Sequence, residues 1–168
     1  FQITSLMLEM DVIDNITLAI LARDNHSYKF WKSARQDIDL RNAALNALEE
    51  IGLEERAFEK VGNLSHGEHR QLEIAMALAT QPHLLLLDEP MAGMGTEEGR
   101  KILKILQKLK KRKTILLIEH DMDVVFALAD RITVLVYGRV IASGSPKSIK
   151  EDEKVREAYL GSDGEINC

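Results

Sequence analysis

Two adjacent carboxylates, Asp88 and Glu89, directly follow the four leucines of residues 84–87. A short run that is apolar at every position is typical of a strand covered on both faces in a parallel sheet, and Pro90 ends its ladder. Open α/β sheets bind ligands at the carboxyl ends of such strands, which is where this acidic pair would lie. One acid could hold a metal ion while the other positions a water molecule. A strand that simply ends in solvated acids is the alternative that this segment leaves open.

A second apolar run, residues 114–118, is followed by a polar turn that contains His120. A segment with helical spacing that starts at Thr96 separates the two runs, which predicts a β-α-β unit with parallel strands. The polar residues after both strands would then lie at the same edge of the sheet. We therefore expect His120 to lie close to Asp88 and Glu89. A histidine after a strand is usually only a loop residue, but this placement favours a role in chemistry.

Ser65 begins another segment that could bind a ligand. Ser65 and Glu68 have the spacing of a capping box, which predicts a helix that starts at this serine. Capping alone accounts for both residues. The same helix end, with the small Gly67, also offers free N–H groups and a hydroxyl to a phosphate. The sequence leaves both interpretations open, because one helix end can serve both purposes.

Cap and stop signals place the other helices of the first 110 residues. Asp11 and Asp39 are placed to begin two helices, and Gly52 is placed to stop the second. Thr96 is expected to cap the helix between the two apolar runs, with acidic residues in its first turn.

The last part of the chain predicts a hairpin and short helices. Residues 132–136 and 140–142 are strand-like and flank the turn dipeptide 137–138. A serine and a proline at 145–146 predict the start of a short helix, and a final helix is expected over residues 152–160.

The composition is ordinary for a soluble globular protein, with 45% hydrophobic and 29% charged residues among 168. A net charge of −5 argues against a nucleic-acid partner. The single cysteine, Cys168, permits no internal disulfide and fits a reducing compartment. No apolar run approaches the roughly 20 residues of a membrane span, and no signal-peptide pattern opens the chain.

Taken in order, these motifs resemble those of the ATP-binding subunit of an ABC transporter. The corresponding segments are Gln2 in the Q-loop position, residues 64–68 as the signature, 84–89 as the Walker B strand, 91–95 as the D-loop and His120 as the switch histidine. The stretches LSHGEHRQLEIAMALA, LLLLDEPMAGMG and VREAYLG are most similar to the branched-chain amino acid importers. The urea or amide importer subunits are the nearest alternative.

The resemblance implies a partial ABC ATPase of the α/β, P-loop NTPase-like class. Such a fold has a mostly parallel sheet flanked by helices, with an α-helical subdomain. The implied segments are a Q-loop region at 1–9, the helical subdomain with the signature at 10–80, the Walker B, D-loop and H-loop part of the core at 81–145, and a helical tail at 146–168.

The resemblance also implies roles for the residues, with ATP and Mg²⁺ as cofactors. Asp88 and Gln2 would hold Mg²⁺, Glu89 would act as the general base on the attacking water, and His120 would contact the γ-phosphate. The implied ATP-binding residues are Gln2, Ser65, His66, Gly67 and Glu68.

The implied partners are a second ATP-binding subunit, transmembrane permease subunits and, indirectly, a periplasmic or extracellular solute-binding protein. Ser65 and Gly67 would contact ATP held by the opposite subunit, so the site would be complete only in a head-to-tail dimer. The protein would lie at the cytoplasmic face of the prokaryotic plasma membrane and would energise amino acid uptake.

Three features depart from the general family pattern. His66 and Glu68 replace a glycine and a glutamine of the signature, and Gly95 replaces an aspartate that many relatives carry in the D-loop. No G-x-x-x-x-G-K-[ST] loop occurs in the chain, which starts at Phe1 without an initiator methionine. We therefore expect an amino-terminal portion beyond this sequence, and we expect these 168 residues alone neither to bind ATP tightly nor to hydrolyse it.

Two further hypotheses are a truncated, non-catalytic module that pairs with a complete subunit, and a DNA-repair ABC ATPase. The second is disfavoured because residues 10–80 show no sustained heptads of a coiled coil.

Overall fold

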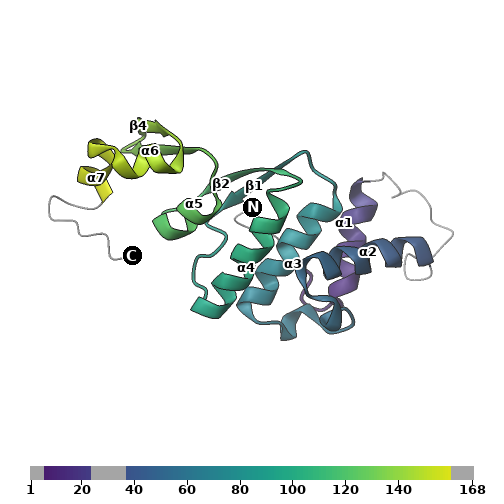
Figure 1. Ribbon diagram of the computed structural model, residues 1–168. Coiled ribbons are helices and arrows are strands. Elements are labelled where there is room, and N and C mark those ends of the chain that lie inside the picture. The colour runs from purple at the N-terminus through teal and green to yellow at the C-terminus, as the bar shows by residue number, and fades with distance from the viewer. Residues whose placement is uncertain (1–5, 24–36, 160–168) are drawn as a thin grey trace. The chain divides into compact units, whose positions relative to one another are not determined.

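The computed structural model describes residues 6–23 and 37–159 (Figure 1). Contacts within the chain divide it between Ile118 and Glu119 into two compact units. The division of the chain by function stays a prediction; its segments are 1–9, 10–80, 81–145 and 146–168. None of the helices in the described ranges combines the length and the apolar character of a membrane span.

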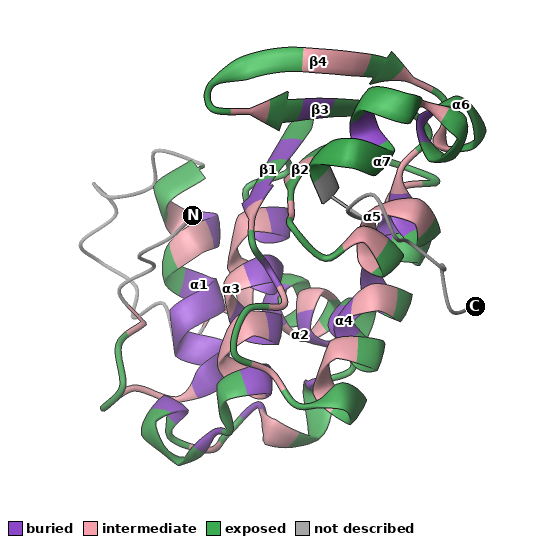
Figure 2. Cartoon of the chain, turned by 90° about the vertical axis from the view of Figure 1, so that its left-hand side faces the viewer, coloured by how far each residue is buried: buried purple, intermediate pink, exposed green. Residues whose placement is uncertain are grey.

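Three helices form the amino-terminal part of the first unit. They are α1 (Val12–Arg23), α2 (Ile38–Ile51) and α3 (His66–Ala79), and each packs against the other two (Figure 1). Two short 3₁₀ turns, Glu54–Arg56 and Val61–Asn63, connect α2 to α3. Figure 2 shows buried residues on all three helices, and the largest of those that are almost wholly buried include Ile13, Ile16, Leu48, Leu72 and Ile74.

The ends of α2 are set by local sequence signals. The Asp37 side chain accepts a hydrogen bond from the Leu40 N–H at 3.2 Å, so Asp37 is the N-cap. The prediction that Asp39 begins this helix is wrong, because Asp39 already lies in the first turn and the extended backbone of a cap occurs at Asp37. Gly52 ends the helix as predicted, with a left-handed φ of 69° and an N–H that donates to the Glu49 carbonyl at 3.1 Å.

The predicted β-α-β unit is confirmed. β1 (Leu84–Asp88) and β2 (Thr114–Ile118) are parallel neighbours, and α4 (Thr96–Leu109) connects them. The register pairs Asp88 with Ile118, so both strands end at the same edge of the sheet.

The start of α4 differs from the prediction by one residue. Thr96 is the first helical residue, and Gly95 occupies the N-cap position with an extended backbone and no side-chain hydrogen bond. Thr96 does not cap the helix because it is already inside the first turn. Glu97 and Glu98 lie in that turn as expected, where their charge favours the positive end of the helix dipole.

One face of the two-stranded sheet is exposed, so the expectation that β1 is covered on both faces is wrong for this structure. Leu85 is 2% exposed and Leu87 is 6% exposed, whereas the alternate residues Leu84 and Leu86 are 48% and 50% exposed. Side chains alternate between the two faces of a strand, and the described residues of the first unit cover only the face of Leu85 and Leu87.

Within its described residues, 119–159, the second unit contains the predicted hairpin and three short helices. Its elements are α5 (Met122–Leu128), β3 (Ile132–Val136), β4 (Arg139–Gly144), α6 (Pro146–Glu151) and α7 (Glu153–Tyr159). The antiparallel strands β3 and β4 are joined at Tyr137 and Gly138, whose φ angles of 48° and 74° match a tight hairpin turn. Ser145 caps α6 through the N–H of Ser148, as its sequence predicts.

Candidate functional site

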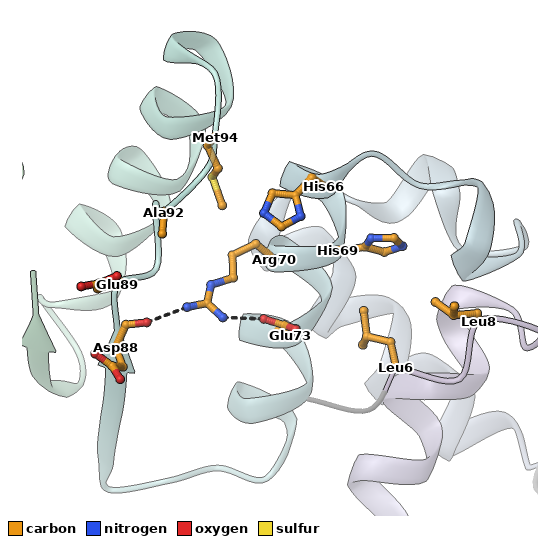
Figure 3. A pocket seen from close by; sticks show the side chains of 10 residues that line it. All are labelled: Leu6, Leu8, His66, His69, Arg70, Glu73, Asp88, Glu89, Ala92 and Met94. Atoms are coloured by element: carbon orange, nitrogen blue, oxygen red, sulfur yellow. Dashed lines mark hydrogen bonds and ion pairs between the residues drawn. The ribbon is translucent and has the colours of Figure 1, made fainter. Parts of the chain in front are cut away.

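A pocket of ≈ 480 Å³ lies between the first turns of α3 and the carboxyl end of β1 (Figure 3). Its lining residues are Leu6, Leu8, His66, His69, Arg70, Glu73, Asp88, Glu89, Ala92 and Met94. All of them belong to the first unit. The pocket therefore brings together three of the predicted site residues, His66, Asp88 and Glu89, from segments that are far apart in the sequence.

The predicted capping box at the start of α3 is confirmed. The Ser65 hydroxyl oxygen accepts a hydrogen bond from the Glu68 N–H at 3.2 Å, and Glu68 Oε2 accepts one from the Ser65 N–H at 2.8 Å. Two N–H groups that a helix start would leave without partners are thus satisfied by side chains. The reciprocal bonds fix the position of the helix end that forms one wall of the pocket.

A carboxylate from α4 lies against this helix end. The Ser65 hydroxyl donates a hydrogen bond to Glu98 Oε1 at 3.0 Å. Gly67 is buried beside the same side chain, and a Cβ atom at Gly67 would lie 2.7 Å from the Glu98 carboxyl carbon. With a side chain at position 67, the Glu98 carboxylate would have to move away from this helix end. The structure therefore shows a negatively charged group at the place where the sequence predicts that an anion could bind.

Glu68 is ionised more readily than an ordinary glutamate. Arg56 Nε donates a hydrogen bond to Glu68 Oε1 at 3.0 Å. Partial burial favours the neutral acid, but the hydrogen bonds from Arg56 and Ser65 outweigh it and lower the pKa of Glu68 below its ordinary value of 4.5. The hydrogen bonds to Glu68 and Glu59 correspondingly raise the pKa of Arg56.

This lowered pKa predicts an acid-dependent contribution to stability. Because the folded state favours the carboxylate, the contribution is present above the ordinary pKa of 4.5 and is lost as the pH falls through the lower folded pKa. We expect Glu68→Gln to flatten the decrease in unfolding free energy in this acidic range, measured by urea unfolding at a series of pH values. Arg56→Met should have the same effect, because it removes the main hydrogen-bond donor. If both variants kept the parent's acid profile, this explanation would be wrong.

The chain turns sharply where β1 ends. Asp88 is half-buried, and Glu89 is exposed with a φ of 43°, in the left-handed region that non-glycine residues rarely adopt. The Glu89 N–H donates to the Ile118 carbonyl at 2.9 Å, and its own carbonyl accepts from the Ala92 N–H at 3.1 Å. Backbone strain of this kind costs about 1–3 kcal/mol and persists only where surrounding contacts hold it.

Sequence reasoning missed three charged or polar residues of the pocket: His69, Arg70 and Glu73. Arg70 reaches from α3 to the end of β1, where it donates to the Asp88 carbonyl at 2.9 Å (Figure 3). It also donates to the Pro90 carbonyl at 3.2 Å. One signal in the sequence could have indicated Arg70 and Glu73. They are spaced three residues apart, as in an i,i+3 ion pair, and the helical residues next to them are mostly buried.

Gln2 and His120 are the other residues for which the sequence predicts a role in this site. Gln2 and the closing residues of the VREAYLG stretch are outside the described residues. His120 belongs to the second unit, where it is exposed and its N–H donates to Glu119 Oε2 at 3.2 Å. Its predicted proximity to Asp88 stays a prediction. Within residues 6–23 and 37–159, no group of three or more His, Cys, Asp or Glu residues is arranged to hold a metal ion.

Comparison with known proteins gives a consistent result. Residues 1–92 match the protein family described as ABC transporter, and residues 139–165 match the family described as branched-chain amino acid ATP-binding cassette transporter. The chain is 37% identical over 171 residues to the high-affinity branched-chain amino acid transport ATP-binding protein LivG of Escherichia coli K12, covering 96% of this chain and 66% of that protein. It is 31% identical over 175 residues to the probable LivG protein of Archaeoglobus fulgidus, covering 100% of this chain and 67% of that protein.

A solved structure of an ATP-binding cassette has a similar fold. The crystal structure of an ATP-binding cassette of an ABC transporter, in its ADP conformation, superimposes with a TM-score of 0.75 at 31% sequence identity, covering 96% of this chain and 67% of that one. The expected α/β class is thereby confirmed. The chain spans 66% of the length of the Escherichia coli relative, which is slightly less than two thirds.

Proposed function

The chain belongs to the ABC transporter family, and we propose that it contributes the signature and catalytic-glutamate segments of an ATPase that energises import of branched-chain amino acids. The amino acid assignment is supported by the names of the relatives and by the family match at residues 139–165. The observation that carries the ATPase proposal is the pocket in which Asp88 and Glu89 lie beside the signature helix α3.

In this proposal the two carboxylates divide the work at the end of β1. Glu89 acts as the general base that takes a proton from the attacking water, and Asp88 holds Mg²⁺ together with Gln2. A lone carboxylate fits this ion, because Mg²⁺ is usually held by one or two carboxylates, with substrate phosphates and water as further ligands. The bound ion would neutralise charge on the phosphates. His120 would contact the γ-phosphate and stabilise the charge that develops there.

The signature segment has a separate role in this proposal. Ser65, His66, Gly67 and Glu68 form the helix end that would contact the γ-phosphate of ATP held by a second subunit. The Glu98 carboxylate now lies against Ser65 and Gly67, so a bound phosphate would take its place.

The partners in this proposal are those of an importer. They are a second ATP-binding subunit in a head-to-tail dimer, transmembrane permease subunits and, through them, a solute-binding protein. The subunit would lie at the cytoplasmic face of the plasma membrane.

Binding of Mg-ATP tests the proposed division of labour. The 168 residues contain no P-loop, whose backbone and lysine would grip the β- and γ-phosphates. We expect no saturable binding by this chain up to millimolar nucleotide in equilibrium dialysis. Saturable binding is expected when a P-loop segment is joined in front of residue 1, a form that we call the completed cassette. Tight binding by the 168 residues alone would contradict the proposed site.

A further inference from the structure

We propose that Arg70 is a positioning residue for Glu89: its guanidinium holds the carbonyl groups of the residues directly before and after the general base and so links the signature helix to the catalytic segment of the same chain. The inference rests on the proposed function, because it assigns Arg70 a role in the reaction that Glu89 would catalyse. Arg70 acts through the backbone, since its recorded contacts with the catalytic segment are to carbonyl oxygens.

Arg70 contacts the residues on both sides of Glu89 in the sequence. Its NH2 group donates to the carbonyl of Asp88 at 2.9 Å, and its Nε donates to the carbonyl of Pro90 at 3.2 Å. These two carbonyls belong to the residues immediately before and after Glu89. Figure 3 shows the Arg70 side chain extending from α3 toward this segment. A single planar group therefore holds both neighbours of Glu89 at once.

Arg70 is itself held in place. Its NH1 group forms an ion pair with Glu73 Oε2 at 2.6 Å, and the Arg70 and Glu73 side chains are only 16% and 18% exposed. Guanidinium presents its donors in a rigid fork, whereas the lysine ammonium is a compact charge on a flexible stem. The orientation of the fork is thus fixed by α3 before any ligand binds.

The strained backbone of Glu89 needs contacts that hold it in place. Glu89 has the left-handed φ of 43°, and its N–H is held by the Ile118 carbonyl of β2 at 2.9 Å. The sheet therefore fixes the peptide group before Glu89 from one side, while Arg70 holds the carbonyls of Asp88 and Pro90 from α3. Without Arg70 the strained turn could relax. A displacement of about 1 Å in a reacting group can lower a rate about 10²-fold.

The direct test is Arg70→Met in the completed cassette. Methionine keeps much of the apolar stem of arginine but has no N–H donors. We expect kcat for ATP hydrolysis to fall about 10- to 100-fold, while KM for ATP stays within about twofold because no contact with nucleotide is removed. An unchanged kcat, or a change confined to KM, would overturn the inference.

Two variants separate positioning from general support of the fold. Arg70→Lys should recover part of kcat, because an ammonium can reach one of the two carbonyls. Glu73→Gln removes the charge that orients Arg70 but leaves both bonds to the backbone, so its effect on kcat should be smaller than that of Arg70→Met. Two outcomes would overturn the inference: Arg70→Lys being no more active than Arg70→Met, or Glu73→Gln lowering kcat as much as Arg70→Met.

A double-mutant cycle with Glu89→Gln gives the sharpest result. If Arg70 acts through Glu89, adding Arg70→Met to Glu89→Gln should cause little further loss of hydrolysis, whereas independent effects would multiply. Multiplied effects would overturn the inference while leaving the proposed function intact. If Glu89→Gln by itself left hydrolysis unchanged, the proposed function would fail first.

Discussion

We expect Glu89→Gln to lower ATP hydrolysis by the completed cassette about 10²- to 10⁴-fold, which is the range that a positioned general base contributes. Glutamine has nearly the same size and shape but cannot accept the proton of the attacking water. The recorded backbone bonds of Glu89, from its N–H to Ile118 and from the Ala92 N–H to its carbonyl, do not involve the substituted group. If nucleotide binding is retained, a loss of activity would therefore reflect chemistry rather than damage to the fold.

The measurement is steady-state phosphate release, together with nucleotide binding to show that the site still forms. Glu97→Gln is a matched control, because it makes the same chemical change at a side chain that is 81% exposed and forms an ion pair with the exposed Arg100. Exposed ion pairs contribute little to stability, and we expect the control to keep the parent's turnover within about twofold. Turnover of Glu89→Gln within about threefold of the parent would rule out the general-base role.

The largest effect on stability is expected for Leu72→Ala. Leu72 is 0% exposed and lies on α3, the helix that packs against both α1 and α2. Truncating a buried leucine removes transfer free energy and leaves a cavity, at a typical cost of about 2–5 kcal/mol. Because domains have only about 5–15 kcal/mol of stability, this single change should shift the unfolding transition strongly.

Urea unfolding followed by circular dichroism measures this effect. Leu18→Ala on α1 is the control, since Leu18 is 41% exposed and its truncation should cost much less. Equal losses of stability in the two variants would show that α3 is not part of the cooperative core.

The elements that could be predicted from the sequence are those with local causes. The capping box of Ser65 and Glu68 depends on residues three positions apart, and the stop at Gly52 depends on one residue that adopts a positive φ without strain. The hairpin turn at Tyr137 and Gly138 has the same local origin. Two aspartates close together, Asp37 and Asp39, could each cap α2, and the prediction from the sequence selected the wrong one.

The contacts of the candidate site were less accessible to sequence reasoning because they join distant segments. The separation between Arg70 and the carbonyl of Asp88, and between Ser65 and Glu98, spans many residues in each case. Neither pair has a spacing that any periodicity would indicate. The exposed face of Leu84 and Leu86 is a further example, because coverage of a strand depends on which other elements pack against it.

The ordered motifs, the β-α-β unit and the family could be predicted without a structure, because they follow from residue type, local propensity and the apolar pattern along the chain. Three features became apparent from the folded chain: Arg70 holds both neighbours of Glu89, Glu98 lies against the signature helix, and one face of the sheet is exposed. The physical reason is that hydrogen bonds and burial depend on distance in space, which the packing of helices against strands sets and local sequence does not.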